Sequence, residues 1–182
     1  MEKAILALKA GGVILHKTDT VWGLACDARN EVAVQKMKDL KGRPDDKGFI
    51  LLINNISDLS VYVENVPDLA WDLIEFAERP LTVVYEKGKN LPENVKATDG
   101  SIAIRLVKDE ACQQLLYKFG RAIASTSANI AGEKTPQKYN EIAEKIIEKV
   151  DYTLMNIGPD EALPPSTIVK LGANGDFSFI RK

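Results

Sequence analysis

Residues 11–53, GGVILHKTDTVWGLACDARNEVAVQKMKDLKGRPDDKGFILLI, contain the pattern that decides the fold. The apolar run Val13–Leu15 follows two glycines and predicts a strand. Asn30 is a preferred N-cap residue, and apolar residues recur every three positions after it. We therefore expect a helix that ends near Gly42-Arg43-Pro44, because proline disfavours helical geometry in the residue before it. The apolar run Phe49–Ile53 predicts a strand that is covered on both faces. A strand, a helix and a second strand in this order indicate an α/β fold.

Helical and strand patterns continue to alternate along the rest of the chain. We expect further helices at 2–10, from Pro67 to Pro80, at Asp109–Gly120 and from Thr135-Pro136 to Val150. In the second of these helices, Phe76 is expected on the buried side. We expect further strands at Leu81–Tyr85, Ile102–Val107, Ala122–Ala124, Ser166–Leu171 and Phe177–Arg181. An Asn-Gly pair between the last two strands favours a hairpin, which makes the sheet mixed rather than purely parallel. The polar segment 87–100 is expected to be a lid or a surface loop. The predicted architecture is one domain over residues 1–182, with an open mixed sheet and flanking helices.

The composition is that of an ordinary globular protein, and it excludes several classes of function. The 182 residues are 45% hydrophobic and 27% charged, with a formal net charge of -2, so no overall positive field attracts nucleic acid. The two cysteines are too few for a disulfide framework or a structural zinc site. The first residues do not resemble a signal peptide, and no run of ~20 apolar residues occurs. We therefore expect a cytoplasmic protein without a membrane partner.

The most common catalytic devices are also missing from the sequence. His16 is the single histidine, so a Ser-His-Asp triad or a multi-histidine metal site is not expected. We predict neither a protein nucleophile nor side-chain ligands for a metal. No G-x-x-x-x-G-K-[ST] or G-x-G-x-x-G motif is present, so a nucleotide would have to be bound by another device.

Polar residues gather at the ends of the predicted strands, where open α/β sheets bind ligands. The groups are Lys17–Thr20; Lys41, Arg43 and Lys47; Arg105; Ser125–Asn129; and Ser166-Thr167 with Arg181. Each group alone also fits a helix cap, a turn or a solvated helix end. Arg105 lies in an apolar strand, so it must reach solvent at the end of the sheet or bind an anion. Together, these hydroxyls, amides and cations indicate a pocket for a polyphosphate.

Five motifs, in order, resemble the successive signatures of one family over roughly residues 3–181. They are Thr18–Leu24 (TDTVWGL), Lys41–Gly48 (KGRPDDKG), Ser101–Arg105 (SIAIR), Ser125–Gly132 (STSANIAG) and Pro165–Val169 (PSTIV). This is the YrdC/Sua5 family of threonylcarbamoyl-AMP synthases, and the chain resembles its single-domain bacterial form. The resemblance implies a twisted mixed α/β sheet around a concave basic cavity. It also implies a reaction of L-threonine, bicarbonate and ATP that gives threonylcarbamoyl-AMP and pyrophosphate, the first step of threonylcarbamoyladenosine formation in tRNA.

The resemblance further implies roles for individual residues. The threonine-binding residues would be Thr20, Arg105, Ser125 and Ser166. The ATP-binding residues would be Lys41, Arg43, Lys47, Ser101, Ser127, Asn129, Thr135 and Arg181. Mg²⁺ would arrive with ATP, and a downstream threonylcarbamoyl transferase would take the product. The net charge leaves at most a weak direct contact with tRNA.

Two other functions stay open at this point. An RNA-binding module could use the same basic cavity without chemistry, although few aromatic residues accompany the basic clusters. A carbamoyl-adenylate-forming enzyme, similar to one domain of the hydrogenase maturation carbamoyltransferases, is the other alternative. Those chains carry zinc fingers, and this chain lacks the cysteines to form one.

Overall fold

The computed structural model describes residues 1–44, 47–155 and 163–182, so Asp45 and Asp46 of the second motif lie outside the described residues. Its helices are α1 (Glu2–Lys9), α2 (Glu31–Lys41), α3 (Leu59–Tyr62), α4 (Asp68–Glu75), α5 (Glu110–Phe119) and α6 (Glu144–Lys149). Its strands are β1 (Ile14–Lys17), β2 (Trp22–Asp27), β3 (Ile50–Ile53), β4 (Leu81–Tyr85), β5 (Ile102–Leu106), β6 (Ile123–Ser127), β7 (Tyr152–Leu154), β8 (Thr167–Leu171) and β9 (Phe177–Arg181).

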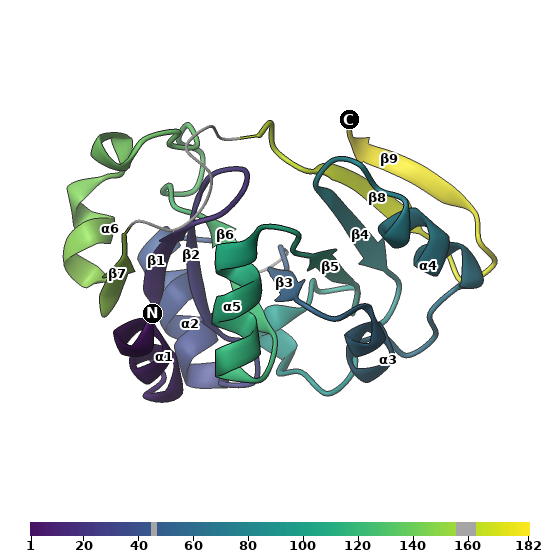
Figure 1. Cartoon of the computed structure of the whole chain (residues 1–182), viewed down its shortest axis with the longest axis horizontal. Coiled ribbons are helices and arrows are strands. Elements are labelled where there is room, and N and C mark those ends of the chain that lie inside the picture. The colour runs from purple at the N-terminus through teal and green to yellow at the C-terminus, as the bar shows by residue number, and fades with distance from the viewer. Residues whose placement is uncertain (45–46, 156–162) are drawn as a thin grey trace.

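The nine strands of the described residues form one mixed sheet in the order β7-β1-β2-β6-β3-β5-β4-β8-β9 (Figure 1). Parallel pairs join β7 to β1, β3 to β5 and β4 to β8, and the other neighbours are antiparallel. β6 lies between β2 and β3, so the chain returns to the middle of the sheet after α5. This arrangement confirms the predicted mixed α/β fold. It also places segments that are far apart in sequence next to one another.

Helices cover both faces of the sheet. α1 and α5 lie in front of the sheet in Figure 1, and their residues Leu8 and Leu115 share a buried cluster with Ala25 of β2 and Ile123 of β6. α2 lies on the opposite face, where its Met37 belongs to a second buried cluster. Because side chains alternate along a strand, β2, β3 and β6 contribute to both clusters.

Several helix boundaries follow local signals in the sequence. The side chain of Asn30 accepts a hydrogen bond from Ala33 N at 3.0 Å, and Asp109 caps α5 in the same way. α2 ends at Gly42 with φ of 61°, a left-handed conformation that glycine adopts without strain. The hairpin between β8 and β9 is also confirmed, with Gly175 at φ of 84°.

Other expectations were wrong in their extent. Thr135-Pro136 does not begin a helix, because the chain makes only a short turn at Tyr139–Glu141 and α6 begins at Glu144. α4 ends at Glu75, so Phe76 is 76% exposed instead of buried. β6 extends to Ser127, so the serine and threonine residues that were expected in a loop lie within a strand.

The sequence does not indicate β2, β7 or α3. β2 has the sequence WGLACD, in which glycine and aspartate are residues with low β-propensity. The sequence therefore does not predict a strand, yet all six residues are buried in one. β7 has three residues and α3 has four, so each is too short to show a period. Segment 87–100 joins two strands that pair with each other, and its residue Val95 is fully buried, with its carbonyl oxygen accepting a hydrogen bond from Phe49 N at 2.8 Å. This segment is an anchored surface loop rather than a lid.

Candidate functional site

A cavity of about 240 Å³ contains most of the predicted site residues. Those that line it are Thr20, Arg43, Arg105, Ser125, Ser127, Thr135, Ser166 and Arg181. Lys41, Lys47, Ser101 and Asn129 do not line it, although they were expected at the site. No residue of the 87–100 loop lines it either.

The register of the central strands explains why these side chains meet. Gly23 of β2 pairs with Ser127 of β6, Ser125 of β6 pairs with Ile50 of β3, and Leu52 of β3 pairs with Arg105 of β5. Because paired residues of neighbouring strands point to the same face, the side chains of Ser125, Ser127, Ile50, Leu52 and Arg105 share one face of the sheet with the α-hydrogen side of Gly23. This is the face that carries α1 and α5, since Leu52 also belongs to their cluster. The two helices cover one part of the face, and the cavity occupies another.

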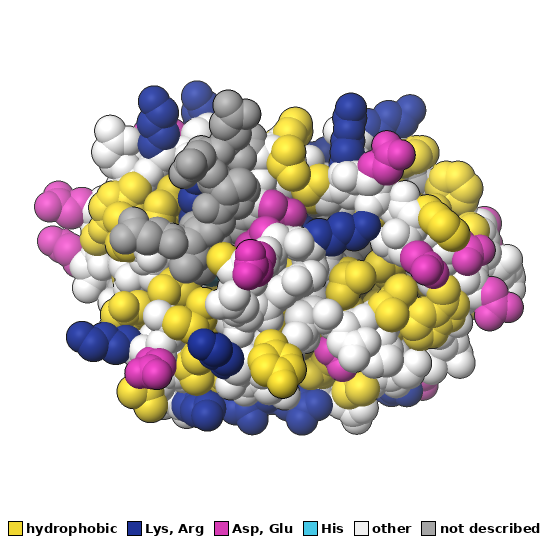
Figure 2. Space-filling model, in the orientation of Figure 1, with side chains coloured by type: hydrophobic (Ala, Val, Ile, Leu, Met, Phe, Trp, Pro, Cys, Tyr) yellow, Lys and Arg dark blue, Asp and Glu magenta, His cyan; other side chains and the backbone are white. Residues whose placement is uncertain are grey.

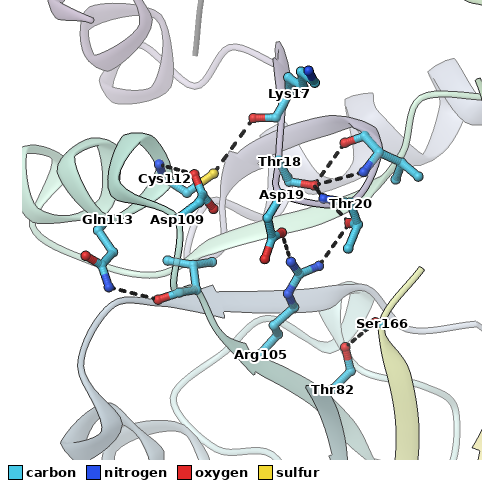
Figure 3. Close-up of polar contacts among 12 residues, drawn as sticks. Lys17, Thr18, Asp19, Thr20, Thr82, Arg105, Asp109, Cys112, Gln113 and Ser166 are labelled. Atoms are coloured by element: carbon cyan, nitrogen blue, oxygen red, sulfur yellow. Dashed lines mark hydrogen bonds and ion pairs between the residues drawn. The ribbon is translucent and has the colours of Figure 1, made fainter. Parts of the chain in front are cut away.

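Arg105 is the most constrained group of the site, with only 5% of its surface exposed. Its guanidinium forms an ion pair with the carboxylate of Asp19 and donates from Nη1 to Thr20 Oγ1 at 3.2 Å (Figure 3). Burial lowers the pKa of Arg105, which is the cost of holding a charge away from water. Nε has no hydrogen-bond partner among the described residues. The arginine therefore keeps one unused donor beside the cavity.

The turn between β1 and β2 positions Asp19 and Thr20. Thr18 Oγ1 accepts hydrogen bonds from Thr20 N and Val21 N, both at 3.2 Å, which closes the turn on itself. The carbonyl oxygen of Asp19 accepts a hydrogen bond from Leu163 N at 2.8 Å, which ties the turn to the segment before β8. The turn is thus held from both sides.

Ser166 and Arg181 form the opposite wall of the cavity. Arg181 donates from Nη2 to the carbonyl oxygen of Ser166 at 2.7 Å and to Ser166 Oγ at 3.2 Å. Ser166 Oγ also bonds to Thr82 Oγ1 at 2.9 Å, as Figure 3 shows for the two hydroxyls. The parallel pairing of β4 with β8 and the β8–β9 hairpin bring the three residues together.

Lys41 and Asn129 do not line the cavity, but they bind Ser127, which does. The ammonium of Lys41, at the end of α2, donates to the carbonyl oxygens of Ser127 at 2.8 Å and Asn129 at 2.9 Å. Burial lowers the pKa of Lys41 to about 8, and the nearby charge of Arg43 adds to the shift. The amide of Asn129 donates to Glu133 O at 2.8 Å and accepts a bond from Ser127 Oγ. These two side chains hold the segment that follows β6.

Arg43 reaches the cavity from the segment after α2. Its Nη1 donates to Thr126 Oγ1 at 3.2 Å, and its guanidinium lies 4.9 Å from the ring centre of Phe49. Lys47 is exposed, and its carbonyl oxygen accepts a bond from Arg43 Nε at 3.0 Å. Ser101 is buried at the start of β5, where its N–H donates to Asp99 Oδ1 at 2.9 Å.

The charges around the cavity favour an anionic ligand. Three arginines, Arg43, Arg105 and Arg181, line it, and the described residues contribute no Asp or Glu to its wall. Asp19 lies close by, but Arg105 already neutralises it. Serine and threonine hydroxyls fill most of the remaining polar surface, so the arrangement suits carboxylate and phosphate groups.

The sequence analysis gave no individual role to Thr18, Asp19, Gly23 or Thr82, although Thr18 and Asp19 belong to its polar group Lys17–Thr20. Asp19 and Gly23 lie inside the TDTVWGL motif, so their position was a signal, but their partner residues are 86 and more than 100 residues away. Thr82 lies in an ordinary strand and gives no signal.

The rest of the molecule offers weaker candidates. A hollow of about 690 Å³ runs beside α2, where acidic, basic and apolar side chains alternate without converging. Figure 2 likewise shows Lys and Arg interspersed with Asp and Glu over most of the face in view. No helix in the described ranges is long and apolar enough to cross a membrane. Within the same ranges, no three His, Cys, Asp or Glu side chains are grouped to hold a metal ion.

Comparisons with known proteins agree with these features. The family model named for Sua5, YciO and YrdC, described as "Telomere recombination", matches residues 6–182. The threonylcarbamoyl-AMP synthase of Idiomarina loihiensis is 33% identical over 171 residues, which cover 92% of this chain and 91% of that protein. The protein of the same name from Pseudoalteromonas translucida is 34% identical over 172 residues, covering 91% and 89%.

Solved structures show the same fold. The crystal structure of P. abyssi Sua5 complexed with L-threonine matches with a TM-score of 0.84 and 28% identity, over 92% of this chain and 49% of that one. This chain therefore spans about half of the P. abyssi protein. E. coli YciO matches with a TM-score of 0.84 and 24% identity, over 99% and 87% of the two chains. Since the family model covers nearly every residue and two relatives exceed 30% identity over nine-tenths of their length, the chain belongs to the Sua5/YciO/YrdC family.

Proposed function

We propose that this protein is a threonylcarbamoyl-AMP synthase, which converts L-threonine, bicarbonate and ATP to threonylcarbamoyl-AMP and pyrophosphate. The observation that carries the proposal is the cavity itself, which Arg43, Arg105 and Arg181 line together with serine and threonine hydroxyls. A substrate with a carboxylate and a second substrate with phosphates match this charge pattern. The two curated synthases, each at least 33% identical over about nine-tenths of the chain, support the same activity.

Threonine would bind between Thr20, Arg105, Ser125 and Ser166. The Nε–H of Arg105 has no hydrogen-bond partner among the described residues, whereas Nη2 pairs with Asp19 and Nη1 donates to Thr20, so a substrate carboxylate would accept its hydrogen bond from Nε. The hydroxyls of Thr20 and Ser166 are left to bind the substrate's own hydroxyl. The P. abyssi relative was crystallised with L-threonine, which supports an amino acid of this kind as the ligand.

ATP would bind along Arg43, Ser127, Thr135 and Arg181. A cavity of about 240 Å³ is smaller than the ~300 to 1,000 Å³ of most ligand sites, so the nucleotide must extend beyond it. Lys47 is exposed next to Arg43, and it would contact the part of the triphosphate that extends out of the cavity. Lys41 and Asn129 act through the Ser127 segment that they hold. Ser101 is expected at the nucleotide by resemblance, but its known contact is to Asp99.

The reaction requires that the substrates are aligned and that negative charge on the phosphates is neutralised. It does not require a protein nucleophile. The amine of threonine attacks the carbon of bicarbonate, and water leaves to give a carbamate. A carbamate oxygen then attacks the α-phosphorus of ATP and expels pyrophosphate. Arg43, Arg181 and the nearby lysines stabilise the negative charge that develops on the phosphates. The hydroxyls of Ser125 and Ser127 hold the carbamate and the α-phosphate in line.

We propose that Mg²⁺ enters with ATP and is held by its phosphates. No Asp or Glu of the described residues lines the cavity, and the nearby Asp19 forms an ion pair with Arg105 that makes it unsuitable as a metal ligand. Bound Mg²⁺ would neutralise charge on the β- and γ-phosphates.

The product would pass to a threonylcarbamoyl transferase that modifies tRNA, in the cytoplasm where tRNA is found. A direct RNA-binding role is less favoured, because the net charge is -2 and the face in Figure 2 carries no dominant basic patch. The fold also matches nucleotide-bound HypF with a TM-score of 0.83, but at 23% identity this shows a common fold alone.

The decisive experiment is pyrophosphate release from ATP, measured with and without threonine and bicarbonate. We expect release only when both are present. Arg43→Ala should reduce the rate by roughly 10² to 10³, the value of one positioned donor to a charged transition state. Lys3→Ala, on the exposed side of α1, is the matched control for loss of one positive charge. Pyrophosphate release that depends on neither threonine nor bicarbonate would overturn the proposal. Tight binding of tRNA without ATP would favour the RNA-binding alternative.

A further inference from the structure

The floor of the cavity contains a glycine that backbone geometry does not require. Gly23 is not among the glycines with positive φ, so any residue could adopt its conformation. A methyl group in place of one α-hydrogen would lie 3.2 Å from the carbonyl oxygen of Thr126, 3.4 Å from Ser125 Oγ and 3.5 Å from His16 Nε2. The missing side chain therefore leaves a small niche above Gly23, with polar atoms on its sides.

His16 forms one side of this niche. It pairs with Gly23 in the β1–β2 ladder, so its side chain lies on the same face of the sheet as the cavity. The residue is fully buried, and its Nε2 has no hydrogen-bond partner among the described residues. A buried nitrogen without a partner costs free energy, so it needs an explanation in a folded protein.

The surroundings of the ring indicate that Nε2 is a bare acceptor. Nδ1 lies 3.9 Å from Cys112 Sγ. The same thiol lies 3.9 Å from the carbonyl oxygen of Lys17, a contact that Figure 3 shows. We assign the tautomer in which the thiol donates to this carbonyl and Nδ1–H donates to the sulfur, which leaves Nε2 with its lone pair. Burial lowers the pKa of His16 to about 4, so the ring is neutral at pH 7.

The other groups of the niche are acceptors as well. Ser125 Oγ donates its proton to Leu24 O at 3.1 Å, which leaves the oxygen lone pairs free to accept. The cavity wall adds three arginines and, within the described residues, no carboxylate. The positive charge of these arginines repels an ammonium group, whereas the neutral oxygen and nitrogen atoms of the niche can accept the N–H bonds of a neutral amine.

We propose that the niche above Gly23 binds the amino group of the substrate amino acid as the neutral amine, with Ser125 Oγ and His16 Nε2 accepting its two N–H bonds. This assignment rests on the proposed function, because it takes threonine to be the ligand. The ammonium proton passes to solvent as threonine binds. The nitrogen lone pair then forms a bond to the carbon of bicarbonate, and water leaves with one amine hydrogen, which gives the carbamate. Ser125 and His16 thus select the one protonation state that can react.

The single histidine makes a direct test straightforward. The probe is the ¹⁵N signal of the imidazole in protein labelled only at histidine, recorded at pH 7. In the free protein we expect a neutral ring with bare Nε2. Threonine should move the Nε2 signal in the direction of hydrogen-bond acceptance. 3-Hydroxybutyrate, which has hydrogen in place of the amine, should not move it at a concentration that displaces threonine. A ring with protonated Nε2, a signal unchanged by threonine, or equal shifts with both ligands would overturn the proposal.

Kinetic variants supply a second measurement. His16→Phe keeps an aromatic ring but removes the acceptor, and it should raise KM for threonine roughly three- to tenfold, the value of one hydrogen bond, without changing KM for ATP. Gly23→Ala should also raise KM for threonine, because its methyl group occupies the niche. Leu154→Met, which alters the core beside His16 in the β1–β7 ladder, should leave both constants unchanged. Equal constants for His16→Phe and the parent would overturn the proposal.

The two proposals fail in different ways. If pyrophosphate release requires threonine and bicarbonate but threonine does not shift the ¹⁵N signal of His16, the niche assignment fails and the synthase activity stands. If threonine moves the His16 signal but pyrophosphate is never released, the amine niche stands and the proposed activity fails.

Discussion

The buried ion pair between Asp19 and Arg105 provides the sharpest test of how the cavity is held together. The two residues are 7% and 5% exposed, so Asp19→Asn leaves the guanidinium without a counter-charge in a region from which water is excluded. Removing one partner of such a pair costs about 3 to 5 kcal/mol. The asparagine amide keeps an acceptor for one hydrogen bond, so we expect the lower figure, about 3 kcal/mol of unfolding free energy.

Urea unfolding, followed by the fluorescence of the buried Trp22, measures this loss. For a chain of this length, about 3 kcal/mol corresponds to a fall in Tm of roughly 6 to 12 °C. Asp27→Asn is the matched control, because it removes a carboxylate whose partner Arg121 is 38% exposed and stays hydrated. We expect that control to lose less than half as much unfolding free energy.

A double variant separates loss of charge pairing from loss of packing. Asp19→Asn with Arg105→Met removes both charges, and it should regain part of the stability that Asp19→Asn loses, because no buried charge is left unpaired. The reasoning is refuted if Asp19→Asn unfolds within 0.5 kcal/mol of the parent, or if the double variant is less stable than the single one.

Three further predictions concern other groups of the site. Burial lowers the pKa of His16 from 6.5 to about 4, so between these values the unfolded chain binds a proton that the folded protein does not. Stability should therefore fall by up to about 3 kcal/mol as pH decreases from 6.5 to 4, and the difference between parent and His16→Phe unfolding curves measures this part. Lys41→Met leaves two carbonyl oxygens without their donor and should lower unfolding free energy by about 2 kcal/mol while raising KM for ATP, measured by pyrophosphate release; an unchanged KM would show that the lysine does not shape the nucleotide side. Serine lacks only a methyl group and should react measurably, whereas valine leaves a hydroxyl of the site unpaired and should be rejected more strongly; equal rates with valine and threonine would contradict the assignment of Thr20.

Much of the fold was predictable because its signals are local. The cap at Asn30, the glycine at Gly42 and the apolar run that ends at Ile53 act within a few residues, so the sequence shows them directly. The TDTVWGL and STSANIAG motifs were likewise visible, and both contain residues that line the cavity. What could not be seen is that Ser125 and Ser127 lie in a strand, because their backbone bonds are made to β2 and β3 rather than to neighbours in sequence.

The sequence by itself therefore determined the α/β class, most helix boundaries, the family and the residue types of the site. Only the tertiary structure decided how those residues are used: that Arg105 is paired with Asp19, that Lys41 holds the cavity from behind instead of facing it, and that Gly23 leaves His16 beside the floor. The physical reason is the order of the strands. Each of these contacts crosses between elements that only the sheet brings together, and the free energy of a buried charge or an unpaired nitrogen depends on those neighbours rather than on the local sequence.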